Sequence, residues 1–112
     1  MKVHIKENLH YAHSRALLAQ LASDTVEVLE QYGLFTRDQN RDLATDLLFR
    51  VCAVLDGSAH AGTLNGETIA PFVGFYLAHE TEDVLIPKDG SGMHAEVGQV
   101  IDEHYSRGSG GA

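Results

Sequence analysis

Residues 33–57 read GLFTRDQNRDLATDLLFRVCAVLDG and decide the fold. Thr36 and Gln39 form the Thr-x-x-Gln pattern of a capping box, in which the two side chains bond backbone N–H groups at a helix start. Apolar residues then recur at helical spacing, and Gly57 follows as a residue type that ends helices. This stretch predicts a helix from Thr36 to Leu55 or Asp56.

A longer helix is predicted before this one, from about Lys6 to Tyr32. Its apolar residues gather on one side and its polar residues on the other, as in a helix half-buried against a core. Gly33 stands where a C′ glycine is expected. Because the link over residues 33–36 is short, the two helices should form an antiparallel hairpin. The apolar side comprises Leu17, Leu18, Leu21, Ala22, Thr25, Val28, Leu29 and Tyr32.

The second helix is unusually apolar around its circumference. About half of its surface is covered by Leu43, Ala44, Leu47, Leu48, Val51, Cys52, Val54 and Leu55. An amphipathic helix that packs on one neighbour has a narrower apolar stripe. The pattern therefore predicts a helix packed on more than one side, with Phe49 on its polar side near Asp42 and Asp46.

The segment after this helix favours short strands. Asp56–Glu67 is rich in Gly, Ser and Asn and is expected to be a loop. Thr68–Ala78 contains an aromatic and β-branched run that predicts a strand, and Asp83–Ile86 predicts the returning strand. His79–Glu82 would be the polar turn between them.

A third helix is predicted near the end of the chain. Apolar residues at helical spacing run from Met93 to Tyr105, and Ser91 is the expected N-cap. Gly98 inside this helix suggests a close helix crossing, because glycine otherwise weakens a helix. Residues 106–112 are expected to be a flexible tail.

The fold class that follows is α+β, in the order α-α-β-β-α. It consists of an antiparallel helical hairpin, a small β-hairpin and a C-terminal helix. The 112 residues suit a single globular domain over residues 1–105.

Composition narrows the classes of partner. Sixteen Asp and Glu against eight Lys and Arg give a formal net charge of −8, and no basic cluster is present. We therefore expect no nucleic acid and no anionic membrane surface as partner. The single Cys52 excludes an intramolecular disulfide, and neither a signal peptide nor a membrane-spanning stretch is found. The expectation is a cytoplasmic protein without a cofactor.

Two of the seven histidines suggest a metal site. His10 and His13 lie three residues apart on the first helix, where they could supply two ligands, with His4 and Glu7 nearby. A third protein ligand would be required. The alternative is that His10 packs at the apolar border and His13 is solvated.

Titratable residues near the predicted loop and turn are candidates for acid–base catalysis. They are Asp56, His60, Glu80 and His94. Sequence alone does not bring the four together. His79-Glu80 begins like a zinc-protease helix motif, but Asp83 stands where the second histidine is required. Residues 57–63 have P-loop glycine spacing and lack its lysine.

Both faces of the predicted strand pair are apolar, and only one can meet the helices. Phe72 and Tyr76, together with Phe49, are therefore predicted interface residues. The preferred interpretation is a non-catalytic protein-interaction or regulatory module that forms a homodimer, or binds a protein partner that is basic. The alternative is a small metal-dependent or acid–base enzyme at the junction of loop, turn and third helix.

Overall fold

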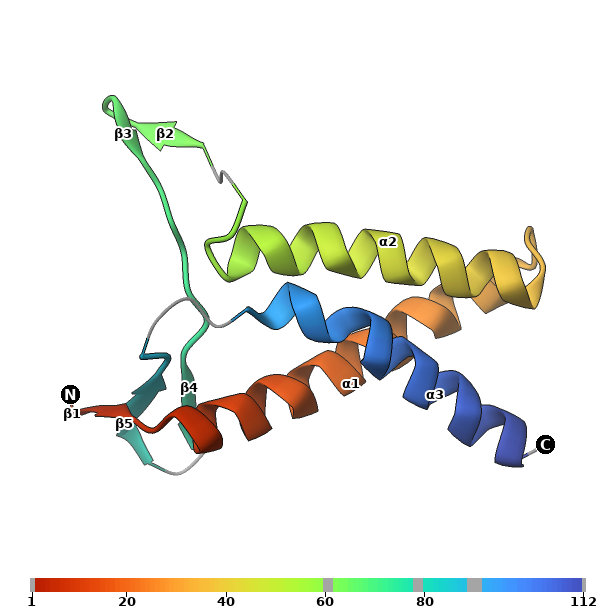
Figure 1. Ribbon diagram of the computed structural model, residues 1–112, viewed down its shortest axis with the longest axis horizontal. Helices are drawn as coiled ribbons and strands as arrows, with labels where there is room; N and C mark the ends of the chain where they lie inside the picture. Colours follow the sequence, from red (N-terminus) through yellow and green to blue (C-terminus); the bar gives the residue numbers. More distant parts are fainter. Residues whose placement is uncertain (1, 60–61, 78–79, 89–91, 112) are drawn as a thin grey trace.

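The chain has the α+β architecture that its sequence predicts. The computed structural model describes residues 2–59, 62–77, 80–88 and 92–111. Helices α1 and α2 form a hairpin, α3 crosses α1, and a small sheet lies at the N-terminal end of α1 (Figure 1). The elements, in order, are β1 (Lys2–Ile5), α1 (Glu7–Tyr32), α2 (Arg37–Leu55), β2 (Thr63–Leu64), β3 (Glu67–Thr68), β4 (Phe75–Leu77), β5 (Glu80–Ile86), a 3-10 turn η1 (Met93–Glu96) and α3 (Val97–Gly111).

The predicted signals for the hairpin are confirmed. The Thr36 hydroxyl accepts from the Gln39 N–H, and the Gln39 side chain accepts from the Thr36 N–H, which completes the capping box. Gly33 adopts φ +63° at the end of α1, a conformation that glycine reaches without a Cβ penalty. Local chemistry at these two ends thus fixes the turn between α1 and α2.

The core lies where the three helices meet. α1 contributes residues four apart, which form one ridge along the helix, and α3 covers them together with α2. Burial of these side chains supplies the main driving force for folding. The cluster comprises Leu18, Ala22, Val26, Ala44, Leu48, Cys52, Met93, Val97, Val100, Ile101 and Tyr105.

The sheet differs from the predicted two-stranded hairpin. Its strand order is β1-β5-β4, and β1 pairs in parallel with β5, with Val3 opposite Val84 and Ile5 opposite Ile86. β1 was not predicted from sequence. The strand predicted over Thr68–Ala78 is ordered as β4 only from Phe75 to Leu77, and Glu80–Glu82 belongs to β5 rather than to a turn. Leu77 of β4 lies opposite Glu80, so pairing with β4 accompanies this earlier start, whereas β1 pairs with Asp83–Ile86.

The predicted loop Asp56–Glu67 also contains structure that was not expected. β2 and β3 pair antiparallel around Asn65 and Gly66, which both adopt positive φ as a two-residue hairpin turn requires. This β2–β3 arm projects away from the helices (Figure 1). Its few residues are exposed, so it adds surface rather than core.

One expectation for the third helix is wrong, and two are not tested. A Cβ at Gly98 would meet nothing within 4 Å, so Gly98 marks no close crossing. α3 continues past Tyr105 to Gly111, where a tail was expected. Ser91 lies outside the described residues, and Gly92 with φ +60° precedes η1. In the part of the chain described, no helix is long and apolar enough to cross a membrane.

Candidate functional site

The exposed side of α2 is the largest departure from the sequence-based expectation. Ala44, Leu48 and Cys52 are buried, as predicted. A second row on the same helix, however, remains 39–52% exposed, so within this chain α2 is packed on one side only. We call this row the α2 stripe. It consists of Leu43, Leu47, Val51 and Val54.

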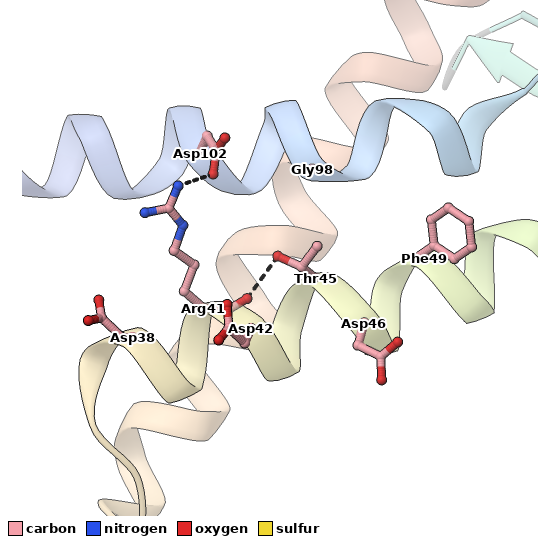
Figure 2. Close-up of a pocket in the computed structure, with 8 residues that line it drawn as sticks. All are labelled: Asp38, Arg41, Asp42, Thr45, Asp46, Phe49, Gly98 and Asp102. Atoms are coloured by element: carbon pink, nitrogen blue, oxygen red, sulfur yellow. Dashed lines mark hydrogen bonds and ion pairs between the residues drawn. The ribbon is translucent and has the colours of Figure 1, made fainter.

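A different side of α2 borders an acidic groove. The groove lies between α2 and α3, has a volume of about 720 Å³, and is lined by eight residues (Figure 2). Arg41 pairs with Asp102 across it, and the Thr45 hydroxyl donates to the Arg41 carbonyl at 2.8 Å. Four carboxylates and one guanidinium therefore line the groove. The lining residues are Asp38, Arg41, Asp42, Thr45, Asp46, Phe49, Gly98 and Asp102.

Phe49, a predicted interface residue, lies at one end of this groove (Figure 2). The residue is 46% exposed, and its ring meets the His94 ring edge-on, with 5.2 Å between the ring centroids. Such a T-shaped contact is a favoured geometry for aromatic rings. Phe49 thus connects the groove to the neighbouring pair of Asp56 and His94.

Asp56 and His94 form the one pair of predicted catalytic candidates that the described residues bring together. The His94 Nδ1–H donates to Asp56 Oδ2 at 2.7 Å, and the His94 backbone N–H donates to the same oxygen at 3.0 Å. The Ser58 N–H donates to the other oxygen at 2.9 Å. The Asp56 side chain is fully buried, whereas that of His94 is 25% exposed.

The environment of Asp56 keeps it ionised. Burial alone would raise its pKa, but hydrogen bonds from His94 and Ser58 outweigh burial, so the pKa lies below the ordinary 3.8. One helical turn away, burial raises the pKa of the Cys52 thiol to about 11, and the Asp56 charge adds to this. Cys52 is therefore a protonated core residue rather than a nucleophile.

This pair has both a structural and a chemical capability. Asp56 joins the C-terminal end of α2 to the first turn of η1, which stabilises the chain reversal between them. The same bond orients the His94 ring and directs its Nδ1–H inward, which leaves Nε2 as the nitrogen that can accept a proton. A carboxylate that orients a histidine is also the arrangement of a general base.

Of the two remaining catalytic candidates, neither can be placed at this pair. His60 lies outside the described residues. Glu80 lies in β5, and its side chain is outside the described part of the structure. The Asp56–His94 contact therefore joins the start of the predicted loop to the third-helix segment, and the predicted convergence with the turn is not tested.

The two histidines proposed as metal ligands pack the start of α1 onto the sheet. His10 Nε2–H donates to the Val73 carbonyl at 2.8 Å, and His13 Nδ1–H donates to the Leu9 carbonyl at 2.8 Å. Both rings contact Phe75, at centroid distances of 5.2 and 5.5 Å. Among the described residues, no three His, Cys, Asp or Glu side chains come together in a way that could hold a metal ion.

The outer part of the sheet carries the other two predicted interface residues. Phe72 and Tyr76 are 59% and 60% exposed. Val3 and Ile5 on β1 are similarly exposed, next to Val84 and Ile86 of β5. We call these residues the sheet face. Tyr76 is thus an exposed apolar strand residue as predicted, whereas Phe72 is exposed but precedes β4, and β1, which was not predicted, enlarges the surface.

Comparison with known proteins adds no family to this geometry. No family model, no curated protein and no solved structure matches the chain. Its function must therefore be inferred from its own surfaces.

Proposed function

We propose that this chain is a non-catalytic protein-interaction module that works as a homodimer. The observation that supports it best is the α2 stripe, a row of four large aliphatic side chains on a regular helix that nothing in the described chain covers. Contiguous exposed apolar surface is typical of protein–protein contacts. The sheet face provides a second surface of the same kind.

The amount of exposed surface supports the same proposal. The chain exposes 7560 Å², whereas a compact monomer of its mass exposes roughly 6,100 Å². Its radius of gyration is 16.0 Å, against roughly 13 Å for a compact domain of this length. The β2–β3 arm accounts for part of this difference (Figure 1). A stable interface buries about 800 Å² on each partner, which is less than the difference between these two exposed areas.

Charge limits where two copies can meet. Two chains of formal charge −8 repel each other at long range, so contact must be made through uncharged surface. The acidic groove is unsuited to self-association for this reason, whereas the α2 stripe and the sheet face have uncharged centres. These two surfaces are therefore the candidates for a homodimer contact.

Sedimentation equilibrium of the purified full chain tests the proposal. Samples from about 1 to 300 µM at 0.15 M salt should approach twice the chain mass of 12.2 kDa, because an interface of the size above gives micromolar or tighter association. The chain mass at every concentration would contradict the proposal. Reversed-phase mass measurement of the same sample excludes covalent dimers through Cys52.

A second candidate function, acid–base catalysis, is favoured by the Asp56–His94 pair alone. A buried carboxylate that orients a partly exposed histidine can promote hydrolysis of an activated ester. Turnover of p-nitrophenyl acetate should then fall in His94→Gln to the background rate given by the other six histidines and the solvent. If the wild-type chain reacts no faster than His94→Gln, the pair has only its structural role.

A further inference from the structure

We infer that the α2 stripe binds the α2 stripe of a second copy, with the two helices antiparallel about a two-fold axis. This inference rests on the proposed homodimer and deepens it by assigning the surface and the orientation. α2 has three sides. One packs into the core, one borders the acidic groove, and the third is the α2 stripe.

The stripe has the form of a helix–helix seam. Its residues are spaced by four, four and three positions, so they fall within about 80° of the helix circumference and extend over about 16 Å. Leu and Val at this spacing are the side chains that fill the contact between two packed helices. The stripe is thus long and narrow enough for one partner helix.

The charges beside the stripe set the orientation. Asp46 and Arg50 lie next to each other on the same edge of the stripe, and their side chains form an exposed pair at 3.3 Å. In an antiparallel pair about a two-fold axis, the same edge of both helices meets with its order reversed. An axis near residue 48 therefore places each Asp46 beside the other chain's Arg50.

A parallel pair does not have this complementarity. The two-fold axis of a parallel pair runs along the helices, so each helix presents the edge with Asp46 and Arg50 to the other edge of its partner. That other edge faces the core of the partner's own chain. Asp46 and Arg50 would then have no opposite charge across the contact. Charge complementarity thus favours the antiparallel arrangement.

The sheet face is the weaker candidate for self-association. β4 has only three residues, of which Tyr76 alone belongs to the sheet face, and Gly74 has no side chain to contribute. A Cβ at Gly74 would lie 3.4 Å from Val84 Cγ2 and 3.6 Å from Ile86 Cγ2, so these two side chains already occupy the space beside Gly74. α2, by contrast, offers a regular helix of 19 residues.

Charge reversal tests the contact without altering the core. Asp46→Arg and Arg50→Asp should each raise the dimer dissociation constant at least about fivefold. Each substitution creates two contacts between like charges in the dimer, one on each side of the two-fold axis. The double variant, in which the two charges are exchanged, should restore the wild-type dissociation constant. Absence of this rescue would contradict the antiparallel pairing. Circular dichroism of each variant checks that helix content is unchanged.

Apolar-to-acidic variants distinguish the two surfaces. Leu47→Glu should raise the dissociation constant by more than about 100-fold, because it would place two carboxylates in an apolar contact. Ile5→Glu on the sheet face and Leu64→Glu on the β2–β3 arm, both equally exposed or more so, should leave it unchanged. If Ile5→Glu dissociates the dimer and Leu47→Glu does not, the inference fails and the homodimer stands. A monomeric wild type would overturn both.

Discussion

Replacement of Asp56 by alanine should destabilise the protein strongly, although Asp56 belongs to no hydrophobic cluster. The side chain is fully buried and accepts three hydrogen bonds, from the Ser58 N–H, the His94 N–H and the His94 ring. Alanine would leave all three donors without their acceptor. The junction between α2 and η1 would lose its main polar contact.

The size of the loss follows from these bonds. A buried donor left unpaired costs about 1–3 kcal/mol. The His94 N–H bears this cost most fully, whereas Ser58 is exposed and regains a bond to water. We expect Asp56→Ala to lower the free energy of unfolding by about 3 kcal/mol, which lowers Tm by roughly 12 °C for a domain of this size. Asp56→Asn keeps one acceptor oxygen and should lose about half as much.

Urea unfolding at a fixed protein concentration measures this loss, because a dimer's stability depends on concentration. The pH dependence gives an independent check. The pKa of Asp56 is lowered in the folded state, so its stabilisation is complete above the unfolded pKa of about 3.9 and disappears as the pH falls through the folded value. The difference between wild type and Asp56→Ala should be constant from pH 7 to 5 and shrink below about pH 4.

Two results would refute this reasoning. A loss below about 1 kcal/mol at pH 7 would mean that water replaces the carboxylate at no cost. An undiminished difference at pH 3 would mean that the ionised form of Asp56 is not what stabilises the junction.

Three further changes test other details of the fold. Gly57→Ala should lower the free energy of unfolding by more than about 2 kcal/mol, because φ is +81° and the new Cβ would lie 2.8 Å from the Pro71 carbonyl oxygen. Gly98→Ala should raise it by up to about 1 kcal/mol, because the new Cβ would meet nothing within 4 Å. Urea unfolding measures both changes. Tyr105→Phe should raise stability by about 1 kcal/mol in the same assay, because the hydroxyl is buried and meets no hydrogen-bond partner among the described residues. Cys52, with its pKa raised to about 11, should not react with a thiol reagent at pH 8 until the protein is unfolded.

The helical hairpin could be predicted because its signals are local. The Thr36 and Gln39 capping box and the αL glycine at Gly33 act within a few residues of chain. The apolar periodicity of α2 is an equally local signal. What the periodicity could not reveal is whether the second apolar row is covered by the same chain or by another, because both arrangements produce the same pattern.

The sheet was predicted less well because its pairing is distant in sequence. Lys2–Ile5 alternates polar and β-branched residues, which is a strand signal, but only the pairing with Asp83–Ile86 makes it a strand. The short β2–β3 arm depends on the turn at Asn65 and Gly66, a strong hairpin signal within a segment whose composition suggested a loop.

The candidate sites show the same limit. Asp56 and His94 were selected for their chemistry, yet 38 positions separate them in sequence, and only the packing of η1 against the end of α2 brings them together. His10 and His13 have suitable spacing for a metal, but spacing does not specify that their N–H groups bond the carbonyls of Val73 and Leu9. A spacing motif therefore needs its third partner before it defines a site.

The measurement that tests the antiparallel α2 contact most directly is oxidative cross-linking of two variants that each carry one added cysteine. Leu47→Cys lies near the two-fold axis, with about 3 Å of axial separation between the two copies, whereas Leu43→Cys copies would lie about 15 Å apart along the helices. A disulfide requires Cα atoms within about 7 Å, and the buried native Cys52 does not interfere. The antiparallel pair predicts a covalent dimer for Leu47→Cys and none for Leu43→Cys. Cross-linking of both variants would indicate a parallel pair, and cross-linking of neither would contradict the α2 contact.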